Sequence, residues 1–172
     1  MAMIENEILA SVYSEEMYNE VKFLEAKDFS KAENRALWVL IQQCDGDTIE
    51  MIKRMSRLQR VSWTNAVQAA CLGVANYKVA QMGCKLVELR FERVLITLLD
   101  DLIVKAQSKI EIAMLQEIKS VVGKNNIFEL AEGSAEYVKQ HASTYTIQRL
   151  KDFREYVDKR FNTIKNIQHG NK

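Results

Sequence analysis

Apolar residues recur along most of this chain at spacings of three and four positions, the pattern of helices with one buried face. The pattern predicts a first helix over residues 4–13 and a second helix that Ser14 caps. Further helices are expected after the capping-box sequence at residues 30–33, after Asp47 and after Ser62. The side chains expected in the core are Ile8, Leu9, Val12, Met17, Val21, Leu24, Leu37, Trp38, Ile41, Cys44, Ile49, Ile52, Met55, Val67, Ala70, Cys71 and Val74.

The most apolar segment covers residues 76–107, where the spacing predicts one long helix. At about 100° per residue, its apolar side chains cover roughly 220° of the helix surface, whereas packing on one neighbour needs only about 100°. This helix is therefore expected to contact two partners. The second partner is either another helix of the same chain or another subunit. Residues 108–122 are expected to continue the helix as far as a turn at Gly123.

Two more helices are expected in the last third of the chain. One covers about residues 127–138 and is weakened by Gly133, and the other runs from about Thr146 to Ile167. The last helix has one apolar face and is basic elsewhere. Its apolar stripe is Leu150, Phe153, Val157, Phe161 and Ile164. With no strand pattern between these segments, the predicted fold class is all-α.

Composition agrees with helices joined by short connections, because the 172 residues include no proline and only 6 glycines. The net charge of +1 conceals a gradient. Residues 1–56 carry 11 acidic and 6 basic side chains, whereas residues 140–172 carry 3 acidic and 7 basic. Such a gradient can steer a partner or a second copy of the chain, although chance clustering on a solvated surface is the alternative interpretation.

The sequence contains no common motif for catalysis or cofactor binding. The phosphate loop, the glycine-rich dinucleotide turn and the GxSxG elbow are all absent. Neither His141 nor His169 has a second ligand at metal spacing. Adjacent acidic pairs point about 100° apart on a helix and do not converge on a substrate. We therefore expect no enzyme activity, no cofactor and no metal.

Features that address a chain to a membrane or to an oxidising compartment are also missing. The first residues contain no basic leader, and no uncharged apolar stretch approaches the ~20 residues that span a bilayer. The three cysteines are odd in number and include no CxxC pair. They are expected to be reduced thiols, and the predicted location is the cytoplasm, away from the membrane.

One basic cluster could contact nucleic acid. It precedes the Ser62 segment and consists of Lys53, Arg54, Arg57 and Arg60. The basic last helix is a second candidate. The nearly neutral charge of the whole chain argues against direct DNA binding. A small helical DNA-binding regulator is kept as one alternative function.

Several short elements of the first half follow one another in a familiar order. They are Glu5-Asn6-Glu7-Ile8-Leu9-Ala10, the pair Val21 and Leu24, Asp28-Phe29, Asn34-Arg35-Ala36-Leu37-Trp38-Val39-Leu40-Ile41 and Asn76-Tyr77-Lys78-Val79. This series resembles the N-terminal domain of the DnaB family of replicative DNA helicases. Residues 127–132 are similar to the return arm of that family's hairpin. Asn34 stands where the family usually has a histidine.

The resemblance covers residues 1–107 and, more loosely, 108–139. It implies a compact helical head over residues 1–75 and a long helical hairpin over 76–139, followed by an extra basic helix and tail over 140–172. In the family, hairpins pair between subunits, and the N-terminal domains form a collar that docks primase or a loader. The ATPase of the family follows in the same chain, whereas here its phosphate loop is absent.

The resemblance therefore implies a non-catalytic interaction and oligomerisation module in DNA replication. The implied partners are the chain itself and a replicative helicase, primase or loader. The alternative is a loader, inhibitor or mimic from a phage or mobile element that binds a host helicase. The candidate interface lies on the long helix, where the wide apolar surface coincides with the family's pairing hairpin. Its residues are Leu86, Leu89, Arg93, Ile96, Leu99 and Ile103.

Overall fold

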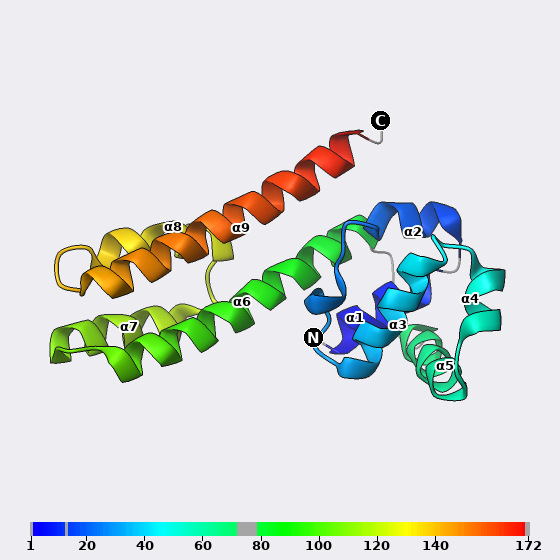
Figure 1. Ribbon diagram of the computed structural model, residues 1–172, viewed down its shortest axis with the longest axis horizontal. Coiled ribbons are helices and arrows are strands. Elements are labelled where there is room, and N and C mark those ends of the chain that lie inside the picture. The colour runs from blue at the N-terminus through cyan, green and yellow to red at the C-terminus, as the bar shows by residue number, and fades with distance from the viewer. Residues whose placement is uncertain (1, 13, 72–78, 171–172) are drawn as a thin grey trace. The chain divides into compact units, whose positions relative to one another are not determined.

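The computed structural model describes residues 2–12, 14–71 and 79–170 (Figure 1). Within these ranges the chain forms helices and turns and no strand, which confirms the predicted all-α fold class. The chain divides into two units, residues 1–90 and 91–172. The division falls inside one helix, whereas the sequence predicted boundaries after residues 75 and 139.

Unit 1 is built around a buried tryptophan. Its elements are α1 (Ala2–Ser11), α2 (Glu15–Val21), the short 3-10 helix η1 (Ala26–Asp28), α3 (Ala32–Gln43), α4 (Thr48–Arg54), α5 (Arg57–Cys71) and the first part of α6 (Val79–Lys105). Helix α1 packs along α5, and α3 contacts both. Trp38 is fully buried, with its ring centroid 5.2 Å from that of Phe29 and its indole N–H donating to the Leu24 carbonyl oxygen at 3.1 Å.

A buried carboxylate joins α1 to the start of α3. Glu5 is fully buried, and its oxygens accept hydrogen bonds from the backbone N–H of Ser30 and the side-chain amide of Asn34, both at 2.6 Å. Glu5 thus ties α1 to the segment that leads into α3 through Ser30 and to the first turn of α3 through the Asn34 side chain. The predicted capping box at Ser30 is wrong, because Lys31 occupies the N-cap and its side chain makes no capping bond.

Turns and caps formed by neighbouring residues follow the sequence prediction. Ser14 accepts from the N–H of Met17 at 3.2 Å and caps α2, and Asp47 caps α4 in the same way. Gly46 and Gly123 end their helices with φ angles of 80° and 85°, which glycine adopts without strain. These connections are therefore specified locally.

Helices α4 and α5 differ most from the prediction. Met51 of α4 and Met55 at its C-cap are buried, whereas Ile49 and Ile52 are 70% and 42% exposed, although both isoleucines were expected in the core. Met51 thus points the inner face of this short helix to the core, and the chain continues that contact at Met55.

Helix α5 begins at Arg57, five residues before the predicted start near Ser62. The Ser56 hydroxyl accepts from the N–H of Gln59 at 3.2 Å, and the Gln59 side chain accepts from the N–H of Ser56 at 3.0 Å. This reciprocal pair is a capping box that the sequence reading missed. Val67 is half-buried, and the side chains of Ala70, Cys71 and Val74 lie outside the described residues.

The first part of α6 packs closely into unit 1. A Cβ atom added to Gly83 would lie 2.8 Å from the Phe23 ring, so glycine permits this approach. Leu86 and Val87 are fully buried, and Arg90 pairs with the buried Asp28 carboxylate at 3.5 Å. The apolar side chains at the start of α6 are therefore covered by unit 1 itself and need no second subunit.

Unit 2 contains the rest of α6 with α7 (Lys109–Val121), α8 (Ile127–Val138) and α9 (Thr144–Gly170). Helices α8 and α9 lie side by side, and α7 contacts α8 (Figure 1). Phe91 of α6 lies within 6.3 Å of Phe153 and 5.8 Å of Phe161, measured between ring centroids. The whole predicted stripe of the last helix is buried. Helix α9 thus packs its apolar stripe into the core of unit 2.

The prediction that the long helix continues beyond residue 107 is wrong. Helix α6 ends at Lys105, and Ser108 caps α7 by accepting from the N–H of Glu111 at 3.1 Å. Ser108 had been assigned to the interior of a helix, although serine favours caps over helix interiors. The turn between Lys105 and Ser108 lets the chain fold back, so that α7 to α9 can enclose one core with α6.

A second buried carboxylate joins α7 to the start of α9. Glu111 is 2% exposed, and one of its oxygens accepts from the hydroxyl and the N–H of Ser143, at 3.1 and 3.4 Å, and from the Thr146 hydroxyl. Burial raises the pKa of this carboxyl, but the hydrogen bonds from Thr146 and Ser143 outweigh burial. The pKa of Glu111 therefore lies below its usual value of 4.5.

Glu111→Ala is expected to lower the free energy of unfolding by about 2 kcal/mol near neutral pH, because Ser143 and Thr146 lose a charged acceptor. Since the folded state lowers the pKa of Glu111, its contribution is complete above the unfolded-state pKa and is lost as pH falls through the folded-state pKa. Urea unfolding between about pH 7 and pH 3 measures both effects.

Glu111→Gln is the matched control, because it keeps one oxygen acceptor without a titrating charge. It is expected to lose less stability than Glu111→Ala and to show a flatter dependence on acid than the wild type. Equal acid sensitivity in the wild type and in both variants would contradict the role given to this carboxylate.

Candidate functional site

The six residues of α6 that the sequence analysis proposed as a protein interface differ in how much of each side chain is exposed. Leu86 and Leu99 are fully buried within their own units, so the prediction is corrected at these two positions. A side chain without exposed surface cannot contact a partner while the fold is intact. Ile96 is 37% exposed. The remaining three, all half-buried, are Leu89, Arg93 and Ile103.

The four residues proposed as nucleic-acid contacts lie on α4 and α5 of unit 1, and two of them are engaged. Arg54 pairs with Glu50 at 2.7 Å. The Arg60 guanidinium donates to the carbonyl oxygen of Ile52 at 3.0 Å, where it meets the negative end of the α4 dipole. Lys53 and Arg57 are exposed.

Large aliphatic side chains accompany these cations. Leu58 is 81% exposed and Val61 is 51% exposed, and their spacing of three residues places them on one face of α5. A single exposed leucine is ordinary, but several aliphatic side chains beside cations indicate a protein contact more than a phosphate contact. We call the exposed faces of these two consecutive helices, taken together, the α4–α5 surface. Its residues are Ile49, Ile52 and Lys53 on α4 and Arg57, Leu58 and Val61 on α5.

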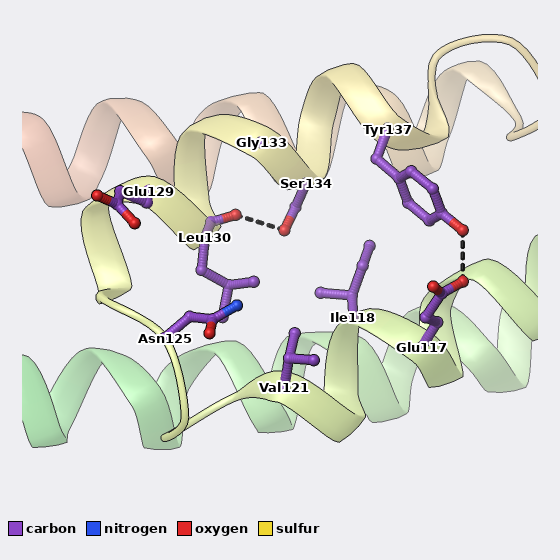
Figure 2. Close-up of a pocket in the computed structure, with 9 residues that line it drawn as sticks. All are labelled: Glu117, Ile118, Val121, Asn125, Glu129, Leu130, Gly133, Ser134 and Tyr137. Atoms are coloured by element: carbon purple, nitrogen blue, oxygen red, sulfur yellow. Dashed lines mark hydrogen bonds between the residues drawn. The ribbon is translucent and has the colours of Figure 1, made fainter.

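Unit 2 has a groove between α7 and α8 that the sequence analysis did not identify (Figure 2). Its volume is about 240 Å³, and two floor residues, Ile118 and Leu130, are 4% and 9% exposed. Pockets for drug-sized ligands measure roughly 300–1,000 Å³, so the size suits one or two side chains of another protein. The lining residues are Glu117, Ile118, Val121, Asn125, Glu129, Leu130, Gly133, Ser134 and Tyr137.

The rim of the α7–α8 groove is acidic. Glu117 and Glu129 line it, and no lysine or arginine does. Figure 2 shows the Tyr137 ring reaching across from α8, and its hydroxyl donates to the Glu117 carboxylate. This hydrogen bond raises the pKa of Tyr137, and burial and the charge of Glu117 act in the same direction. The phenol therefore keeps its proton and its bond at neutral pH.

Gly133 opens the groove in the middle of α8. A Cβ atom built at this position would meet no atom within 4 Å, so packing does not require glycine here. Glycine inside a helix costs about 1 kcal/mol relative to alanine. The missing side chain leaves the lining open beside Ser134, whose hydroxyl bonds to the Leu130 carbonyl of its own helix (Figure 2).

A wider groove of about 640 Å³ lies between α6 and α9 and includes Arg93. Lys105 and Arg149 both lie over the ring of Tyr145, at 5.4 and 5.9 Å from its centroid. Lys105 also pairs with Asp101 at 3.2 Å. The cations of this groove are thus occupied by neighbours in the same unit, and the α7–α8 groove is the better candidate for docking.

The described residues contain no candidate metal cluster and no candidate membrane span. Among them, no three His, Cys, Asp or Glu side chains are grouped so that they could hold a metal ion. None of the described helices combines the length and apolar character that crossing a membrane requires.

Gly133→Ala is expected to raise the free energy of unfolding by about 0.5–1 kcal/mol, since the methyl group meets no neighbour and alanine favours the helix. Gly123→Ala is the matched control, because its φ of 85° strains any other residue, and it should destabilise the protein by about 1 kcal/mol. Urea unfolding measures both. A loss of stability in Gly133→Ala would contradict the open lining described here.

Comparison with known proteins found no relative of this chain. No family model, no curated protein and no solved structure matches the chain. Function is therefore inferred from the surfaces of the two units and from the motif residues quoted above.

Proposed function

We propose that this chain is a non-catalytic protein-interaction and oligomerisation module. The observation that carries the proposal is the α7–α8 groove, with its apolar floor, its acidic rim and the opening at Gly133. Grooves between helices commonly take the apolar face of an amphipathic helix. The two carboxylates of the rim favour a helix with basic residues beside its apolar anchor.

Within this role, we propose a place in DNA replication, similar to the helicase N-terminal collar that docks primase or a loader. The support is the series of motif residues in the first half of the chain. Several of them, including Ile8, Leu9, Leu37 and Trp38, are fully buried, and Glu5 and Asn34 form the polar link at the start of α3. The motif thus coincides with residues that hold unit 1 together.

The test is the native mass of the protein by light scattering, alone and with a purified replicative helicase or primase. We expect an assembly larger than the monomer for the wild type and a weaker one for Gly133→Ala, whose methyl group makes the groove shallower. Gly133→Trp should abolish the assembly by filling the groove. Glu129→Lys should weaken it by reversing one rim charge, and it serves as a second variant that leaves α8 without a bulky substitution.

A strictly monomeric protein that binds neither helicase nor primase would overturn the proposal. If Gly133→Trp assembles as tightly as the wild type, the groove is not the contact surface, and that part of the proposal is wrong. An unwinding assay separates a collar-like role from an inhibitor or mimic, because an inhibitor slows the helicase. Salt-dependent DNA retention that Arg57→Ala abolishes would instead support the DNA-binding alternative.

A further inference from the structure

We propose that the α7–α8 groove binds the α4–α5 surface of a second copy of this chain, so that copies associate head to tail. The inference rests on the proposed function, since it names the partner of the groove described there. Both contact surfaces belong to the same sequence, one in unit 1 and one in unit 2.

The charges of the two surfaces are complementary. The groove is lined by Glu117 and Glu129 and by no basic residue. The α4–α5 surface presents Lys53 and Arg57, both exposed. Opposite potentials of this kind steer association and disfavour contact between two grooves or between two basic surfaces. The groove is therefore better matched to the α4–α5 surface than to itself.

The apolar parts also correspond. Leu58 is the most exposed leucine among the described residues, at 81%, and Val61 lies one turn farther along α5. The groove has an apolar floor formed by Ile118, Val121 and Leu130 and has room for side chains of this size. Seating Leu58 there removes apolar surface from water on both copies, which favours association.

This contact is heterologous, because it joins two different surfaces. Each copy then offers one groove and one α4–α5 surface, so association continues from copy to copy until a ring closes or a filament forms. A twofold dimer built on one shared face would behave differently, because it stops at two chains. The two geometries predict different outcomes when variants are mixed.

The decisive experiment mixes two full-length variants that are each defective in one surface. Leu58→Glu keeps its groove but loses its anchor, and Gly133→Trp keeps its anchor but fills its groove. Sedimentation velocity should show the wild type growing beyond the dimer with concentration and each variant alone as a monomer. The equimolar mixture should form a two-chain species, since one functional contact remains and cannot propagate.

Arg57→Glu and Glu129→Arg keep the inference falsifiable if Gly133→Trp does not fold. Each should weaken self-association at least tenfold. Their mixture should recover growth beyond the dimer, because the reversed charges of the two variants attract each other just as the native pair does. Val104→Glu is the matched surface control, because Val104 is 84% exposed and lies outside both surfaces. It should assemble like the wild type, and so should Ile96→Glu.

Three results would overturn the inference. The first is a monomeric wild type whose binding to helicase or primase is lost in Gly133→Trp, which leaves the partner-docking part of the proposed function standing and removes its oligomerisation part. The second is dissociation by Ile96→Glu but not by Leu58→Glu, which moves self-association to α6. The third is a mixture of the two variants that stays monomeric although both are folded by circular dichroism.

Discussion

Each unit of this protein depends on a buried carboxylate that accepts hydrogen bonds at the start of a helix distant in sequence. Glu5 of α1 holds the start of α3, and Glu111 of α7 holds the start of α9. Free N–H and hydroxyl donors at a helix start need acceptors, and a buried charge needs donors. The carboxylate and the donors at the helix start therefore satisfy each other's hydrogen-bonding requirement. The position of the distant helix follows from this pairing as much as from apolar packing, which by itself tolerates sliding and rotation.

The sequence revealed the features that depend on neighbouring residues. The caps at Ser14 and Asp47 and the glycine turns follow local rules, and the stripe of α9 follows from a spacing of three and four. Glu5 lies 25 positions from Ser30, and Glu111 lies 32 from Ser143. No spacing rule links residues so far apart. The capping box expected at Ser30 does not form, because Lys31 is the N-cap of α3 and Ser30 donates its N–H to the distant Glu5.

The candidate surfaces show a second limit. The hydrophobic pattern around α4 placed Ile49, Ile52 and Met55 in the core and left Met51 out. The fold buries Met51 and Met55, and the isoleucines become part of an exposed surface. The long helix shows the reverse case, since its wide apolar surface suggested an interface at Leu86 and Leu99, which the cores of the two units bury. A hydrophobic pattern shows how much apolar surface a helix has, but it does not show which other segment or molecule covers that surface.

The signal for the α7–α8 groove was present in the sequence, in a glycine between Leu130 and Tyr137 on a helix without need of it. That position sets stability against binding. Replacing Gly133 by alanine relieves a helix penalty without any repacking. A library screened only for heat resistance should therefore collect substitutions at this residue, and the enriched clones would be better folded proteins with a shallower groove. Thermostability and partner capture would have to be screened together to keep the groove open.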